Sequence, residues 1–196
     1  MLKLITVMMF RISGWKLVGE FPSHIKKCIV VGAPHTSNFD FIYALAGFYK
    51  LKIPVRYLIK EDWLKFPLLK TLFKKSGAIS VNRSKTNTMV DALAESITSA
   101  KDSLVLLITP EGTRKYAPVW KTGFYHTALK ANVPIVLSSL DYAKKLAIIG
   151  PHFMPTGCYK RDMLTLKKFF QNITPRYPQN FCPDIYRVEE DAICAG

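Results

Sequence analysis

The sequence predicts an α/β fold, a single domain with a central, largely parallel or mixed β-sheet flanked by helices. Short apolar and β-branched runs alternate with helical patterns of ten or more residues, and such alternation indicates crossover connections between parallel strands. Residues 104–108 form a near-continuous apolar run, which is typical of a strand buried on both faces. The 196 residues, 49% of them apolar, are enough for one core and exclude global disorder.

The expected elements follow one another without a linker as far as about residue 172. Strands are expected at residues 28–33, 55–59, 78–81, 104–109, 134–140 and 146–149. Helices are expected at residues 38–50, 62–75, 88–101, 121–131 and 160–170. The chain is therefore expected to have three parts, namely an N-terminal amphipathic or interfacial helix (1–18), the main domain (19–172) and a proline-rich tail (173–196).

The N-terminal segment predicts a short amphipathic helix and not a membrane-spanning one. Three basic residues interrupt it, so no apolar run approaches the ~20 residues that a spanning helix needs. One side of the expected helix carries large apolar residues, namely Leu4, Ile5, Met8, Ile12 and Trp15. That side suits a helix lying in a membrane interface, and it equally suits a terminal helix packed on the core of the domain.

The cysteines and the N-terminus together indicate a cytoplasmic protein. Cys28, Cys158, Cys182 and Cys194 show no CxxC pair and no zinc-site spacing with histidines, so no metal is expected. The uncharged stretch near the N-terminus is short for a signal peptide. We therefore expect four reduced thiols.

The net charge of +14, from 28 Lys+Arg against 14 Asp+Glu, predicts an anionic partner, either nucleic acid or an anionic membrane surface. Much of the excess lies within residues 50–75, where eight basic residues alternate with large apolar ones. This mixture fits an interfacial surface, a solvated helix face over the core, or a nucleic-acid surface that uses the aromatic side chains for stacking. No nucleic-acid-binding signature appears, which favours the membrane.

The loop after the first expected strand carries His35 and Asp40. If a helix begins at residue 37 or 38, Asp40 falls in its first turn and its carboxylate can point back at the imidazole. A histidine held in this way suits a general base near neutral pH. The spacing of Ser37 and Asp40 also fits a helix capping box, with His35 an ordinary turn residue.

Two further loops, each also following an expected strand, carry candidate anion receptors. Open α/β sheets gather such loops at the carboxyl ends of their strands, so we expect the three loops to meet at one edge of the sheet. Arg83 has the planar fork that suits a phosphate, although a lone arginine also fits an ordinary surface. Gly112 and Arg114 could receive an oxyanion, although residues 109–112 also fit a type I turn. No nucleophile motif or glycine-rich nucleotide motif appears. A base with anion receptors and no enzyme nucleophile indicates transfer onto a hydroxyl of the substrate.

Four sequence blocks, in order, resemble those of the glycerolipid acyltransferases, the family of the 1-acylglycerol-3-phosphate acyltransferases. Residues 34–40 (PHTSNFD) resemble the block NHxxxxD, with Pro34 in place of Asn. Residues 77–83 (GAISVNR) are similar to the second block, which ends in Arg. Residues 109–115 (TPEGTRK) resemble FPEGTRS, and residues 133–137 (VPIVL) resemble VPIVP, with Leu137 for the second Pro.

The resemblance implies fatty-acyl transfer from acyl-CoA or acyl-carrier protein to the free hydroxyl of a lysoglycerophospholipid such as 1-acylglycerol-3-phosphate. It places such an enzyme in phospholipid biosynthesis, without a cofactor, on the cytoplasmic face of a membrane as a peripheral protein. It gives His35 the role of base and Asp40 that of orienting it. The implied substrate-binding residues are Arg83, Glu111, Gly112, Thr113 and Arg114.

Three other functions stay open on the sequence. One is acyl transfer to a lysolipid without glycerophosphate, because Pro34 and Leu137 depart from the family blocks. Another is a catalytically silent lipid-binding module with the same fold. The last is a basic nucleic-acid-binding protein, for which the histidine and glutamate loops would have no role.

Overall fold

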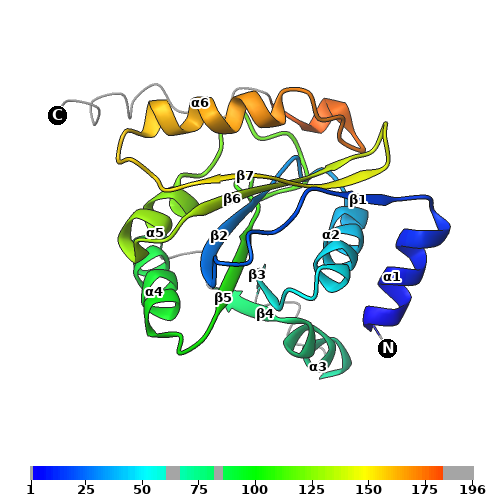
Figure 1. Cartoon of the computed structure of the whole chain (residues 1–196), viewed down its shortest axis with the longest axis horizontal. Coiled ribbons are helices and arrows are strands. Elements are labelled where there is room, and N and C mark those ends of the chain that lie inside the picture. The colour runs from blue at the N-terminus through cyan, green and yellow to red at the C-terminus, as the bar shows by residue number, and fades with distance from the viewer. Residues whose placement is uncertain (1, 61–66, 82–85, 183–196) are drawn as a thin grey trace.

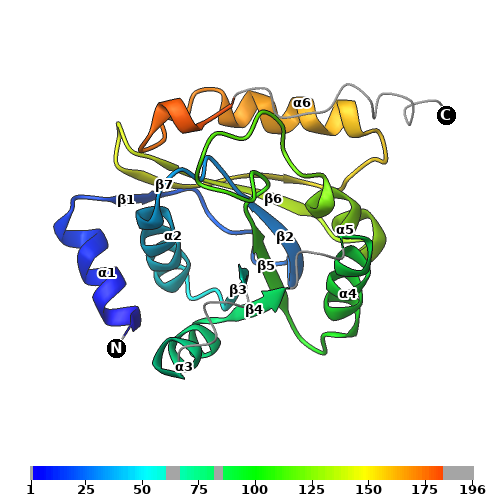
Figure 2. The ribbon, with the colours of Figure 1, turned by 180° about the vertical axis from the view of Figure 1, so that it is seen from behind.

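The computed structural model describes residues 2–60, 67–81 and 86–182, and in them a seven-stranded mixed sheet lies between helices on its two faces (Figure 1 and Figure 2). The strands are β1 (Lys16–Val18), β2 (Lys27–Gly32), β3 (Val55–Lys60), β4 (Ala78–Val81), β5 (Leu104–Ile108), β6 (Ile135–Asp141) and β7 (Leu146–Phe153). Their order in the sheet is β1-β7-β6-β2-β5-β3-β4. Strands β6 and β7 pair antiparallel and the other pairs are parallel. The predicted α/β class is confirmed.

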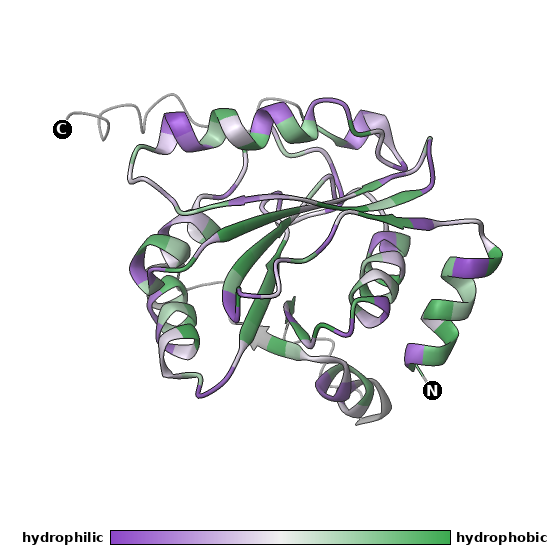
Figure 3. Ribbon diagram, viewed as in Figure 1, coloured by the Kyte–Doolittle hydropathy of each residue, from purple (hydrophilic) through white to green (hydrophobic). Residues whose placement is uncertain are grey.

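The helices are α1 (Leu2–Ile12), α2 (Asn38–Lys50), α3 (Pro67–Ser76), α4 (Thr86–Ser99), α5 (Gly123–Ala131) and α6 (Tyr159–Phe170). Helices α4, α5 and α6 cover one face, where Leu93, Phe124 and Met163 belong to one buried cluster. Helix α2 covers the other face with Leu45 and Phe48. The central strands serve both clusters because their side chains alternate between the faces, and Figure 3 shows these strands as the most hydrophobic part of the fold.

Strand β2 lies between β6 and β5, and this placement brings the candidate loops together. The parallel register pairs Val31 with Ile108 on one side and with Leu137 on the other. The carboxyl ends of β2 and β5 therefore meet at the same edge of the sheet, where open α/β sheets place their sites. Residues 33–37 and 109–122 leave the sheet at this edge.

The N-terminal segment differs from the single helix expected over residues 1–18. Helix α1 ends at Ile12, and residues 16–18 form β1, which pairs with β7 at the edge of the sheet. Trp15 is buried with Phe10 and stacks on Tyr43 at 4.5 Å, so the expectation that it lies on the same helix side as Leu4 and Ile12 is wrong. The other expected apolar residues, Leu4, Ile5, Met8 and Ile12, are exposed.

The structure agrees in part with the expected helix at residues 62–75 and with the expected reduced cysteines. The helix expected at residues 62–75 corresponds to α3, which begins at Pro67, while residues 61–66 lie outside the described residues. Cys28 and Cys182 are buried thiols, but Cys158 is in a disulfide, so the expectation of reduced thiols is wrong there. Burial raises the pKa of Cys28 to about 12, which makes it a core residue and not a nucleophile.

None of the helices in the described ranges has the length and apolar character needed to cross a membrane.

Candidate active site

His35 and Asp40 meet at the junction of the loop after β2 and the first turn of α2. The Nδ1 atom of His35 lies 3.1 Å from Oδ2 of Asp40. Because a carboxylate only accepts hydrogen bonds, Nδ1 is the donor and Nε2 keeps its lone pair. The side chain of His35 is 22% exposed and that of Asp40 is 6% exposed, so the ring is accessible while its partner is shielded. This is the geometry that a general base needs.

The same carboxylate also caps α2. Ser37 is the N-cap residue, and its backbone N–H donates to Oδ2 of Asp40 at 2.8 Å. The backbone N–H of Thr36 donates to the same oxygen, also at 2.8 Å. The capping box and the histidine–carboxylate contact, which the sequence leaves as alternatives, are therefore both present. Because the helix start fixes the carboxylate, the carboxylate can in turn fix the imidazole.

Glu111, from the loop after β5, holds the backbone of the histidine loop. Its Oε1 atom accepts a hydrogen bond from the backbone N–H of His35 at 2.8 Å. Its Oε2 atom is buried and has no hydrogen-bond partner among the described residues. Burial raises the pKa of Glu111 to about 7, against the lowering effect of the hydrogen bond from His35. Glu111 thus links the loop after β5 to the loop after β2.

The raised pKa of Glu111 predicts a pH-dependent stability. The carboxyl titrates near 4.5 in an unfolded chain and at about 7 in the fold, so the unfolded chain releases its proton first. As the pH rises from 4.5 to 7, the free energy of unfolding should fall by roughly 3 kcal/mol on this account. Glu111→Gln should lack this fall, and denaturant unfolding of both proteins at pH 5 and pH 8 measures it. Parallel pH profiles for the two proteins would contradict the assignment.

Three other predicted site residues, Gly112, Thr113 and Arg114, follow Glu111 in the loop after β5. Gly112 has a φ of 64°, and a Cβ there would come within 3.0 Å of the Lys121 side chain, so the turn favours glycine. Thr113 and Arg114 are exposed, and Arg114 donates a hydrogen bond to the Asn38 side chain at the start of α2.

Arg83, which follows β4, lies outside the described residues.

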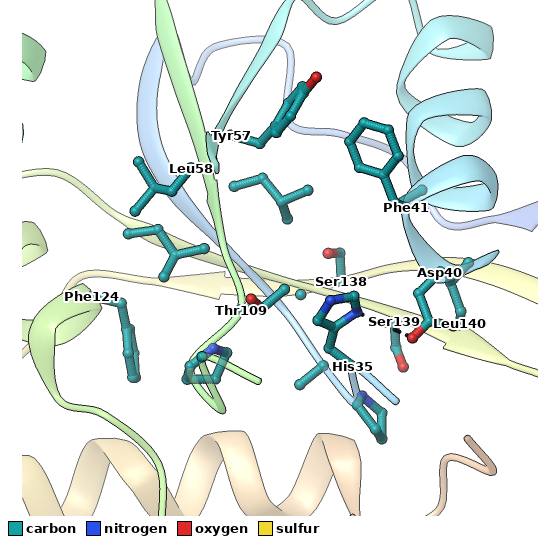
Figure 4. Close-up of a pocket in the computed structure, with 18 of the residues that line it drawn as sticks. His35, Asp40, Phe41, Tyr57, Leu58, Thr109, Phe124, Ser138, Ser139 and Leu140 are labelled. Atoms are coloured by element: carbon teal, nitrogen blue, oxygen red, sulfur yellow. Dashed lines mark hydrogen bonds and ion pairs between the residues drawn. The ribbon is translucent and has the colours of Figure 1, made fainter. Parts of the chain in front are cut away.

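A pocket of about 480 Å³ opens beside His35 at the edge of the sheet (Figure 4). Most of its lining is apolar and comes from α2, the central strands and α5, as with Phe41, Leu58 and Phe124. Polar groups gather at one end, where His35 projects into the pocket beside Asp40. A mostly apolar cavity with polar groups at one end suits a hydrocarbon chain attached to a polar reacting group.

The sequence did not reveal three residues that line the pocket or contact the His35–Asp40 pair. Lys121 lines the pocket beside Gly112. Ser139 also lines it, with a buried hydroxyl that has no partner among the described residues. Tyr142 donates a hydrogen bond to Oδ1 of Asp40 at 2.6 Å. These residues lie outside the motif positions quoted for the blocks, and no local pattern marks them.

Within residues 2–60, 67–81 and 86–182, no three His, Cys, Asp or Glu side chains gather in a way that could hold a metal ion.

Known proteins resemble this chain at three levels. A family model described as Acyltransferase matches residues 17–138. The 1-acyl-sn-glycerol-3-phosphate acyltransferases of Limnanthes alba and Limnanthes douglasii are each 28% identical over 118 residues, which are 58% of this chain and 41% of theirs. The crystal structure of the 1-acyl-sn-glycerophosphate acyltransferase PlsC from Thermotoga maritima superimposes with a TM-score of 0.61 at 16% identity, covering 90% of this chain and 79% of that one. The last match concerns the fold alone.

Proposed function

The chain belongs to the acyltransferase family, and from this membership we propose that it transfers a fatty acyl group from a thioester donor to the hydroxyl of a lysoglycerophospholipid. The observation that carries the proposal is the position of His35, held by Asp40 at the polar end of a mostly apolar pocket of about 480 Å³. The apolar lining would hold the fatty chain, and the imidazole would stand where the reacting groups meet.

In the proposed reaction, Nε2 of His35 takes the proton of the acceptor hydroxyl as its oxygen attacks the thioester carbonyl. The carbon–oxygen bond forms, and the carbonyl oxygen becomes an oxyanion. When this intermediate collapses, the carbon–sulfur bond breaks and the thiolate leaves with the proton from the imidazolium. The buried hydroxyl of Ser139 is a candidate donor to the oxyanion. Asp40 stabilises the imidazolium in between.

We infer that the acceptor carries a phosphate, such as 1-acylglycerol-3-phosphate. Two cations support this acceptor. Lys121 lines the pocket beside Gly112, and the exposed Arg114 donates a hydrogen bond to the Asn38 side chain at the start of α2, three residues after His35. Arg83 would join them in the arrangement implied by the family blocks. The names of the Limnanthes relatives support this acceptor, although the matched region spans 41% of their length.

Acyl transfer is tested with purified protein, radiolabelled oleoyl-CoA or oleoyl-acyl-carrier protein, and lysophosphatidate or lysophosphatidylcholine as acceptor. We expect labelled phosphatidate to form. Product from lysophosphatidylcholine alone would overturn the phosphate-monoester acceptor, and hydrolysis of the thioester without any acylated lipid would overturn the transferase proposal.

We also propose that α1 docks the protein on an anionic membrane. Leu4 and Ile12 are 74% and 79% exposed, and the basic side chains of Lys3 and Arg11 are exposed on the same helix. Phe10, on the inner side, is fully buried and secures the helix to the domain. An apolar outer face with flanking cations is typical of a helix lying in a membrane interface.

Replacing Leu4 and Ile12 together by glutamine should weaken binding to phosphatidylglycerol-containing vesicles at least roughly ten-fold, because each apolar side chain contributes about 1.5–3 kcal/mol when fully buried. Deleting the helix is a poorer test, since it would remove Phe10 from the core. Leu164→Gln, at an exposed position of α6, is the matched control and should bind as the unaltered protein does. Co-sedimentation measures both. Equal binding of the double variant would show that α1 does not dock.

A further inference from the structure

The chain after α6 turns back over the loop that carries the histidine. Residues 174–182 form this segment, which we call the C-terminal strap. The backbone N–H of Tyr177 donates to Oγ1 of Thr36 at 3.2 Å, directly beside His35. The carbonyl of Thr174 accepts from the backbone N–H of Tyr142 at 2.9 Å. The strap therefore contacts both the histidine loop and the residue that follows β6.

The strap also reaches the loop after β5. The Sγ of Cys182 donates to the carbonyl of Pro118 at 3.3 Å, and the Tyr116 hydroxyl donates to the same sulfur at 3.6 Å. One segment thus fastens both loops that bear the predicted site residues. It lies beyond residues 17–138, which match the family model.

Tyr142 connects the strap to the carboxylate of Asp40. Its hydroxyl donates to Oδ1 of Asp40 at 2.6 Å, on the oxygen that His35 does not use. Burial, this hydrogen bond and the charge of Asp40 all raise the pKa of Tyr142, so the hydroxyl stays protonated and remains the donor. Its ring packs edge-on against Trp15 at 4.9 Å, which fixes the direction of the hydroxyl.

Arg176 of the strap packs against two aromatic rings next to the hydrogen bond between Tyr142 and Asp40. Its guanidinium carbon lies 4.1 Å from the centroid of the Phe39 ring and 5.9 Å from that of Tyr142. Phe39 directly precedes Asp40 in the first turn of α2. Arg176 can therefore hold both the aromatic ring beside Asp40 and the tyrosine that bonds to it.

We propose that the C-terminal strap, through Arg176 and Tyr142, positions the Asp40 carboxylate and thereby the His35 imidazole. Tyr142 and Arg176 are positioning residues, since neither lines the pocket in which substrate would sit. The proposal rests on the acyl transfer proposed above. Oδ2 accepts from two backbone N–H groups and Oδ1 accepts from Tyr142, and these three hydrogen bonds oppose rotation of the carboxylate away from the imidazole.

Tyr142→Phe tests the contact because it removes the hydroxyl and keeps the ring. We expect kcat for oleoyl transfer to lysophosphatidate to fall roughly ten-fold with both KM values unchanged, since the loss of one hydrogen bond is worth about one factor of ten. The matched control is Tyr43→Phe, in the same aromatic cluster, which should keep full activity. A raised KM with unchanged kcat would make Tyr142 a substrate contact and overturn the proposal.

A second readout needs no activity. The Nδ1–H proton of His35, identified in the proton NMR spectrum by its loss in His35→Ala, should shift in Tyr142→Phe and exchange faster with water. If the unaltered protein transfers no acyl group, the proposed function fails while this signal still tests the strap. If Tyr142→Phe is fully active and its signal is unmoved, the strap proposal fails while the function stands.

Arg176→Gln tests the strap itself. We expect a several-fold loss of kcat, a shift of the same Nδ1–H signal and partial recovery in Arg176→Lys, which keeps the charge but not the planar group. Lys168→Gln makes the same charge change on the exposed side of α6 and should leave activity and signal unchanged. An Arg176→Gln protein with unaltered kcat and an unaltered signal would overturn the role of Arg176.

Discussion

Replacing His35 with alanine is expected to lower kcat for acyl transfer by roughly 10³-fold, within the range that a positioned general base contributes. Without the imidazole, the described part of the pocket has no other carboxylate-oriented base that could take the proton of the acceptor hydroxyl. The backbone of residue 35 would keep its hydrogen bond to Glu111, because that bond comes from the main-chain N–H. The fold should therefore survive, and KM for the thioester should change little.

Single-turnover acyl transfer with labelled oleoyl-CoA measures the loss, and circular dichroism with a thermal melt checks the fold. His24→Ala is the matched control, because His24 is exposed and its ring contacts His152 and not the pocket. It should transfer acyl groups at the normal rate. If His35→Ala keeps more than a tenth of the normal kcat while folded, a different group must take the proton.

Local pattern was enough to predict the sheet and the meeting of the two loops. The apolar run at residues 104–108 predicts a central strand because it must be buried on both faces, and β5 occupies that place. Parallel strands bring their carboxyl ends to one edge, so the contact between the His35 and Glu111 loops follows from topology alone. The three-residue strand β1 was missed, because so short an edge strand has no periodicity of its own.

The contacts that complete the site depend on tertiary packing and have no local signal. Tyr142 is 102 residues from Asp40 along the chain, and it reaches Asp40 because the β6–β7 hairpin returns to the start of α2. Tyr177 is 141 residues from Thr36 and arrives by way of α6. Trp15 would lie on the apolar side of a helix that continued to residue 18, yet α1 ends at Ile12 and the indole packs on Tyr43. Helical periodicity cannot reveal such a helix end.

Asp40→Asn is expected to lower kcat by about 10³-fold, which is about 4 kcal/mol of activation free energy. The free energy of unfolding should fall by only about 1–2 kcal/mol. The amide oxygen can replace Oδ2 and keep accepting from the backbone N–H groups of Thr36 and Ser37, so the helix cap survives. The amide nitrogen would then face the Tyr142 hydroxyl, which can turn to accept. The full negative charge opposite His35 is lost, and with it the stabilisation of the imidazolium.

The double variant separates this effect from simple damage to the helix start. If Tyr142 acts only by holding the carboxylate, Tyr142→Phe should cost roughly ten-fold in kcat alone but almost nothing when added to Asp40→Asn. Asp91→Asn, on the exposed side of α4 where Asp91 pairs with Lys130, removes a surface charge and serves as the control. Additive losses in the double variant would mean that Tyr142 and Asp40 affect the rate independently. A fully active Asp40→Asn protein would mean that the imidazole needs no carboxylate to serve as the base.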